Sequence, residues 1–319
     1  MIPKNTGKCS MSRIGIVSKR GWILFIALGI IWGTPYLFIR IAVVDLSPAV
    51  VVFGRVMIAA LILLPIAIHQ GHARSLKTHW KGILTFAAIE MCIPFGALGV
   101  AEKEISSSLT GLLIATVPLI NAVISRQLGL DSVWDAQRIL GLFVGFFGVG
   151  MLVGFDISAS NYWAIILCLV AASGYALGPI IITKLLSDVA SIGVIAWSLL
   201  VAGIVYLPFV TYEVLNDSWR APGVTEVSQE AILSVIALGV LCSAIAFVAL
   251  FALIAEVGPT RTTVITYINP AVAIILGVII LSEPITTGIM IGFPLVLIGS
   301  VMATRRNVEV SSVSAAEER

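Results

Sequence analysis

The chain has 319 residues, of which 59% are hydrophobic and 11% are charged, and its mean hydropathy is +1.08. Soluble domains contain about 25% charged residues, so this composition excludes a soluble globular protein and indicates an integral membrane protein. The net charge of +2 conceals an uneven distribution of basic residues along the chain.

Ten apolar segments are each long enough to cross a bilayer, which takes about 20 residues in a helix. Backbone groups in lipid must hydrogen-bond within their own segment, so the sequence predicts an all-α protein with ten transmembrane helices. In chain order, the segments are 22–40, 48–68, 82–101, 108–125, 138–155, 161–182, 191–212, 231–254, 262–281 and 286–303. The connectors are short and leave no room for a soluble catalytic domain. The longest break, Asn216 to Gln229, is expected to be a solvated loop.

The basic residues predict the orientation in the membrane. If residues 1–20 lie in the cytoplasm, so do fifteen of the 19 basic residues, namely Lys4, Lys8, Arg13, Lys19, Arg20, Arg74, Lys77, Lys81, Arg126, Arg138, Lys184, Arg261, Arg305, Arg306 and Arg319. Cytoplasmic loops are enriched in Lys and Arg. We therefore expect a multi-pass protein of the cytoplasmic (inner) membrane with both tails, residues 1–20 and 305–319, in the cytoplasm. Topology alone explains this distribution, so no nucleic-acid partner is expected. The first apolar run lacks a small-residue cleavage motif, which favours a retained helix over a signal peptide.

Landmark residues recur at matching spacings in the two halves of the chain. Asp131 lies thirteen residues after Pro118, and Glu283 lies thirteen residues after Pro270. Five spans per half force the second copy to enter the membrane upside down, which is the pattern of inverted-repeat transporters. The sequence therefore predicts two inverted five-helix repeats with a working site between them near mid-bilayer. The two repeats would span residues 21–156 and 160–304.

Prolines are expected to interrupt several of the helices. Each removes a helical hydrogen bond, and the freed carbonyl is tolerable in a membrane only beside protein or a water-filled cavity. We interpret five prolines, placed in both halves, as hinges that line a central pathway. For any single proline, a kink that serves only packing is the alternative. The five are Pro35, Pro94, Pro118, Pro179 and Pro270.

Two charged residues, Arg55 and Glu90, lie well inside predicted spans. With a rise of about 1.5 Å per residue, their backbones differ in depth by only about 5 Å. A lone charge at such depth costs several kcal/mol, so each is expected to face the bundle interior. One interpretation is an ion pair that holds the two helices in register. The other is functional: Glu90 binds protons or a substrate amine, while Arg55 orients the substrate or binds its carboxylate.

Polar and aromatic residues cluster around the helix breakers. A binding cavity needs a few polar groups among apolar and aromatic walls. Our further candidates for the substrate pathway are Trp32, Tyr36, Asn121, Tyr175, Tyr267 and Asn269. The alternative is that the Tyr and Asn side chains only bond neighbouring helices and that Trp32 only fills space.

Two further features are interpreted as structural, with substrate contact as the alternative for the glycine pairs and gating as the alternative for the two acidic residues. Small residues four apart let helices approach closely, either within the bundle or across a homodimer. The glycine pairs are Gly141–Gly145, Gly150–Gly154 and Gly288–Gly292. Asp131 and Glu283 are each expected to cap the helix that follows, by accepting backbone N–H bonds.

Three stretches of the sequence carry a family resemblance. They are IWGTPYLFIR in the first span, FGRVMIAALILLP in the second and TYINPAVAIILGVIILSEPIT in the ninth. On these stretches the chain resembles the EamA-type transporters of the drug/metabolite transporter superfamily over about residues 22–304. The first half departs from the family pattern at Asp131, where a Glu is usual. The resemblance implies a secondary transporter that carries small metabolites (amino acids, related amphipathic compounds or drugs) across the cytoplasmic membrane, often outward.

Other functions fit the sequence less well. No phosphate-cradling glycine loop ending in Lys-Ser or Lys-Thr is present, so coupling must come from ion gradients, with protons as the candidate ion, or from the substrate's own gradient. No His/Glu metal motif occurs, so neither a metal nor a cofactor is predicted. The partners expected are the lipid bilayer and a small-molecule substrate. A membrane-embedded enzyme, a channel and a non-transporting membrane partner are the alternatives.

We expect alternating access, with spans one to four and six to nine around a central cavity and spans five and ten at the periphery.

Overall fold

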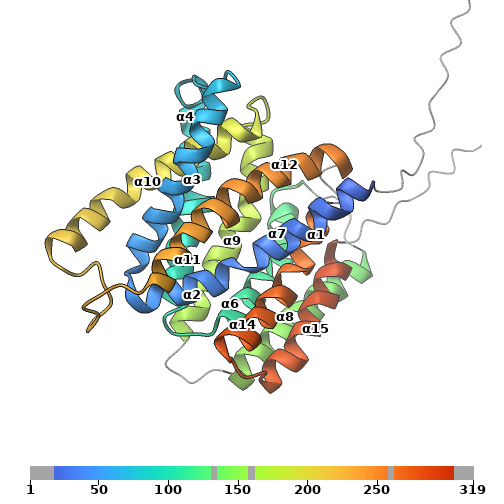
Figure 1. Cartoon of the computed structure of the whole chain (residues 1–319). Helices are drawn as coiled ribbons and strands as arrows, with labels where there is room; N and C mark the ends of the chain where they lie inside the picture. Colours follow the sequence, from blue (N-terminus) through green and yellow to red (C-terminus); the bar gives the residue numbers. More distant parts are fainter. Residues whose placement is uncertain (1–17, 131–134, 157–161, 258–261, 305–319) are drawn as a thin grey trace, which may run out of the picture.

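The computed structural model describes residues 18–130, 135–156, 162–257 and 262–304. Asp131, whose predicted role is to cap a helix, and most of both predicted tails lie outside these residues. Among the described residues, nine helices are long and apolar enough to cross a membrane, and Ile265–Leu281 is a tenth, shorter apolar helix. The prediction of an all-α membrane protein with ten membrane helices is confirmed (Figure 1).

Several of the ten spans consist of more than one helical segment. The first five are α1 (Lys19–Gly33) with α2 (Pro35–Asp45), α3 (Pro48–His69), α4 (Ser75–Phe86) with the π-helix η1 (Ala87–Cys92) and α5 (Ile93–Ala101), α6 (Ser107–Ile114) with α7 (Val117–Gln127), and α8 (Ala136–Asp156). The last five are α9 (Tyr162–Leu185), α10 (Ser191–Leu215), α11 (Gln229–Gly239) with the π-helix η3 (Val240–Ile245) and α12 (Ala246–Val257), the 3-10 helix η4 (Thr263–Tyr267) with α14 (Asn269–Leu281), and α15 (Thr287–Thr304).

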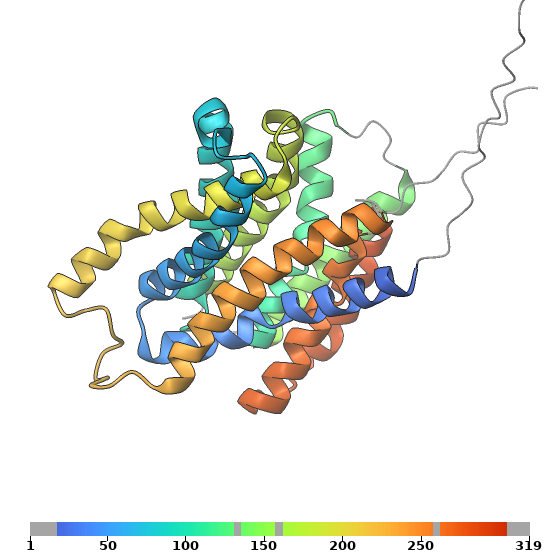
Figure 2. The same ribbon diagram turned by 45° about the horizontal axis from the view of Figure 1, so that its top comes forward.

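The first and last described helices begin and end at the same end of the bundle, which we call the tail end. There the Ser18 hydroxyl donates to the Glu256 carboxylate at the end of α12, and the Tyr267 hydroxyl lies 2.7 Å from that of Thr304. Both views show α1 and α12 side by side (Figure 2). The opposite end, which we call the distal end, carries the connectors 46–47, 102–106, 216–228 and 282–286.

Breaks in the helices recur at corresponding places in the two halves. Pro35, Pro94, Pro118 and Pro270 each stand in the first or second position of a new helical segment, and the segment that carries Pro94 follows η1 directly. The two π-helices begin 153 positions apart, at residues 87 and 240. The expected interruption at Pro179 is wrong, because α9 continues through it and the Pro179 side chain is exposed. One missing N–H leaves the other helical bonds of α9 in place.

The helices α8 and α15 pack closely against each other at one side of the bundle (Figure 1). A Cβ added at Gly148 would lie 2.8 Å from both Leu295 Cβ and Val296 N, so these backbones approach too closely for a side chain. The expectation that glycines serve helix packing holds here, within the bundle. Gly150 and Gly154 face open space and make no such contact within the bundle, so for them packing across a homodimer stays a prediction. At about 100° per residue, positions nine apart lie on opposite sides of a helix, so Gly150 points away from the side that carries Gly141.

We expect Gly148→Ala to destabilise the protein by about 1–3 kcal/mol, because the added methyl meets backbone that cannot move aside. Gly150→Ala, on the same helix, should change stability by less than about 0.5 kcal/mol. Thermal unfolding of both purified variants in detergent checks this difference. Equal midpoints would show that the α8–α15 contact does not need the glycine.

Candidate functional site

A buried arginine lies at the centre of the polar interior. Arg55 on α3 is 7% exposed, its Nε donates to Ser243 Oγ at 3.0 Å, and its guanidinium lies 3.9 Å from the centre of the Phe95 ring. Within the described residues its two Nη nitrogens donate no hydrogen bond and no ion pair joins it to Glu90. The interpretation of Arg55 and Glu90 as an ion pair is therefore wrong. Similar depth in the membrane does not suffice to pair these two residues, because the Arg55 side chain turns toward η3 and the Glu90 side chain turns toward α9.

Glu90 occupies the π-helix η1 and packs against α9. A Cβ at Gly178 would overlap the Glu90 carboxylate, so only glycine at that position leaves room for it. Oε2 of Glu90 is buried and has no hydrogen-bond partner in the described part of the chain. π-Helices are rare and occur frequently at functional sites. Here each π-helix carries an interior polar group, Glu90 in η1 and Ser243 in η3, again 153 positions apart.

Tyr175 on α9 lies near the charged residues. It is within electrostatic reach of Arg55, Glu90 and Glu102. Tyr36 on α2 is within reach of Tyr175, Arg55 and Glu102, and its ring lies beside Gly111 of α6. In the described residues no hydrogen bond engages either tyrosine hydroxyl. The structure thus brings together four predicted site residues from four different spans: Arg55, Glu90, Tyr36 and Tyr175.

The other predicted pathway residues contact neighbouring helices. The Trp32 ring lies edge-on to Phe247 of α12, with centroids 6.1 Å apart. Asn121 Nδ2 donates to the Ala176 carbonyl at 2.8 Å, and the Tyr267 hydroxyl contacts α15. The Asn269 amide, with its nitrogen turned toward α1, donates to the Gly29 carbonyl at 3.0 Å. These contacts agree with the alternative in which Asn and Tyr join helices.

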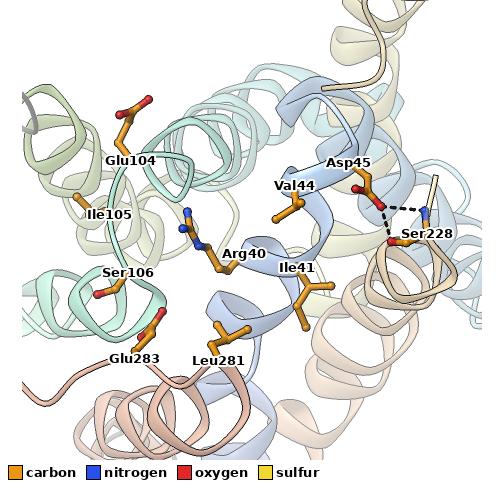
Figure 3. Close-up of a pocket in the computed structure, with 10 residues that line it drawn as sticks. All are labelled: Arg40, Ile41, Val44, Asp45, Glu104, Ile105, Ser106, Ser228, Leu281 and Glu283. Atoms are coloured by element: carbon orange, nitrogen blue, oxygen red, sulfur yellow. Dashed lines mark hydrogen bonds between the residues drawn. The ribbon is translucent and has the colours of Figure 1, made fainter. Parts of the chain in front are cut away.

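A pocket of about 410 Å³ opens at the distal end (Figure 3). Its lining consists of one basic residue, three acidic residues, two serines and four apolar residues, namely Arg40, Asp45, Glu104, Glu283, Ser106, Ser228, Ile41, Val44, Ile105 and Leu281. Asp45 Oδ2 accepts from Ser228 N at 2.8 Å and from the Ser228 hydroxyl, and Ser228 is the N-cap of α11. A carboxylate of the first half therefore holds the start of a helix in the second.

Glu283 forms the converse contact. Its carboxylate accepts from Ser107 N at 2.7 Å and from Ser108 N at 3.0 Å, so it caps α6. The prediction that Glu283 caps the following helix, α15, is therefore wrong. The chain reverses at Ser282, which has a φ of 55°, and Glu283 N donates back to Gly277 O at 3.1 Å. A Cβ at Gly277 would overlap the Glu283 carboxylate, so the glycine lets it reach α6.

Sequence reasoning missed Glu102, which follows α5. It is 0% exposed, and neither carboxylate oxygen has a hydrogen-bond partner in the described residues. Arg40 Nη1 donates to the backbone carbonyl of Glu102, not to its side chain. In the sequence Glu102 looks like an ordinary charge at the boundary of a span. Only the packing of α2 and α9 over the end of α5 buries it.

Comparisons with known proteins agree with this fold. The sequence profile of the EamA-like transporter family matches residues 19–154 and, a second time, residues 162–305. The uncharacterized inner membrane transporter YedA of Escherichia coli K12 is 28% identical over 252 residues, covering 79% of each chain. The uncharacterized transporter YvbV of Bacillus subtilis is 25% identical over 279 residues, covering 86% of this chain and 88% of that one. A solved structure, 19% identical, matches 91% of this chain and 98% of its own with a TM-score of 0.62, which shows a shared fold.

We expect Glu283→Gln to lower the stability of the protein by about 1 kcal/mol, a typical contribution of a helix cap. The amide keeps one acceptor but loses the second and the charge that faces the positive end of the α6 dipole. Glu226→Gln, at an exposed position of the 216–228 connector, is the control and should change stability by less than about 0.5 kcal/mol. The measurement is chemical denaturation of both purified variants in detergent. Equal stabilities of the two variants would contradict the assignment of Glu283 as the cap of α6.

Proposed function

This chain belongs to the EamA-like transporter family, and we propose that it is a secondary transporter that exports small amphipathic metabolites, above all amino acids and compounds related to them, across the cytoplasmic membrane. It is a multi-pass membrane protein. The relatives named above are transporters, which supports transport over catalysis for this chain.

The observation that carries the proposal is the unpaired guanidinium of Arg55. A charge inside a membrane protein is costly, faces the interior and is normally paired. Arg55 has a serine and an aromatic ring beside it and no acidic partner among the described residues. A guanidinium presents donors in a planar fork that matches a carboxylate. We assign Arg55 to the carboxylate of the transported solute.

Glu90 supplies the opposite charge. Tyr175 interacts electrostatically with both Arg55 and Glu90, so the two charged residues lie near the same tyrosine. A solute with a carboxylate and an ammonium group can satisfy both residues, with the Tyr175 hydroxyl between them. Phe95 and Trp32 offer aromatic surface for an apolar side chain. The arrangement favours zwitterionic solutes over simple anions.

The transport mechanism proposed is alternating access between two inverted repeats, residues 21–156 and 160–304. Recurrent breaks at Pro118 and Pro270 and recurrent π-helices support this symmetry. Such breaks are places where a span can bend. In this mechanism Pro35 and Pro94 are further bending points, and the α8–α15 pair is a peripheral scaffold.

The test of function is export from cells and counterflow in proteoliposomes, with leucine, phenylalanine, threonine and phenylethylamine as solutes. We expect Glu90→Gln to abolish transport and Arg55→Lys to reduce it roughly 10- to 100-fold, because hydrogen bonds to charged groups contribute about 1.5–3 kcal/mol and lysine lacks the fork. Glu226→Gln is the control. All variants should reach the membrane in equal amounts. Full activity of Glu90→Gln or Arg55→Lys would rule out this site.

The proposed orientation has its own test. A membrane-impermeant maleimide should label Cys9 in inverted vesicles but not in intact cells, and Cys9→Ala should remove that labelling. An added thiol in the 216–228 connector, Glu226→Cys, should show the reverse pattern, because the connector lies at the distal end. Labelling of Cys9 from outside would contradict a cytoplasmic tail.

A further inference from the structure

The inference starts from the environment of Glu102. Its side chain is fully buried, yet neither oxygen accepts a hydrogen bond from any described residue. An ionised carboxylate without hydrogen bonds in such surroundings is strongly disfavoured, and a buried carboxyl normally becomes neutral instead. The lack of hydrogen-bond partners therefore favours the protonated form of the Glu102 carboxyl over the ionised form.

Charged and titratable groups face Glu102 from several elements. They are Arg40 and Tyr36 on α2, Arg55 on α3, Tyr175 and Cys168 on α9, and Glu283 in the 282–286 connector. Arg40 lies on the pocket side of Glu102, and Arg55 belongs to the interior site. Glu102 thus lies between the distal pocket and the proposed solute site, in reach of one arginine at each.

The balance of these groups favours proton binding. Burial raises the pKa of Glu102 well above its usual range, Arg40 opposes this rise, and Glu283 adds to it. Glu102 also caps the carboxyl end of α5, where the helix dipole disfavours a negative charge. A raised pKa means that Glu102 keeps its proton to a higher pH than an exposed glutamate does, and that the proton leaves as the pH rises further or as an arginine moves closer.

The distal pocket provides a path to the carboxyl. Arg40 lines this pocket and at the same time donates to the Glu102 carbonyl. Figure 3 shows its side chain running from α2 toward the connector that carries Glu104 and Ser106. A small displacement of this flexible side chain would bring water from the pocket to the buried carboxyl.

We propose that Glu102 is the proton-binding residue of the transport cycle and that it is loaded from the distal pocket past Arg40. This inference rests on the proposed export function. A proton passes from external water to the Glu102 carboxylate while the pocket is open, and it leaves to the cytoplasm after the protein has switched. Inward proton flow then drives the solute outward.

The first test needs no solute. Infrared spectra of the purified protein, recorded from about pH 5 to about pH 10, span the values known for ordinary and for buried glutamates. We expect a protonated-carboxyl band that disappears as the pH rises and that Glu102→Gln lacks. Glu104→Gln, an exposed pocket residue two positions away, should retain it. A spectrum unchanged by Glu102→Gln would overturn the proposal.

The second test uses proteoliposomes and the solutes named above. With one proton exchanged per solute, one pH unit can sustain about a tenfold solute ratio, the acidic side being the richer. We expect this accumulation in the wild type and in Glu226→Gln, at an exposed position outside the pocket, but a ratio of about one in Glu102→Gln. Counterflow, which needs no net proton movement, should persist in Glu102→Gln and thereby show that it is folded. Glu102→Asp should recover part of the accumulation.

These outcomes separate the two proposals. If the wild type moves none of the solutes, the proposed function fails, and the infrared titration still decides whether Glu102 binds a proton. If Glu102→Gln accumulates solute as well as the wild type does, the proton assignment fails while the transport function stands.

Discussion

The structure depends on one constraint, which is that every backbone N–H and C=O inside the membrane must find a partner within the protein. Straight helices meet it unaided, but this protein breaks its spans repeatedly. Side chains add hydrogen bonds to carbonyls at these breaks: Thr34 donates to the Ile31 carbonyl at 2.8 Å, Thr116 to the Leu113 carbonyl at 2.6 Å, and Tyr206 to the Cys92 carbonyl at 2.8 Å. Polar side chains therefore gather where the helices are interrupted, and the candidate solute site lies at the same places.

The polar contacts also join the two halves of the chain. Arg55 of the first half bonds Ser243 of the second, Asp45 holds the start of α11, and Glu283 holds the start of α6. Two of these three contacts lie at the distal end and border the pocket. A movement of one half against the other would have to exchange these bonds together. Arg40 lines the pocket and bonds the backbone of Glu102, which is within electrostatic reach of Arg55 in the interior site.

The interior holds more ionisable groups than its packing requires. α8 and α15 meet closely at glycines such as Gly148 and show how this chain joins helices by packing. Arg55, Glu90 and Glu102 lie elsewhere and have few or no bonds to their charged atoms in the described residues. Replacing such groups with apolar residues would be expected to leave packing intact or improve it. Their presence fits the proposed reversible binding of a solute and of a proton during transport.

The sequence by itself determined the class of protein and the ten membrane helices, because hydropathy and helical rise depend only on local residue order. It also located the recurrent prolines. Only the tertiary structure decided which neighbouring helix each of the charged side chains points toward. It separated Arg55 from Glu90, joined Arg55 to Ser243, turned Glu283 toward α6 and buried Glu102 at what looked like a helix boundary. A position on a helix specifies depth, but which neighbour a side chain meets depends on how helices far apart in the chain rotate and pack.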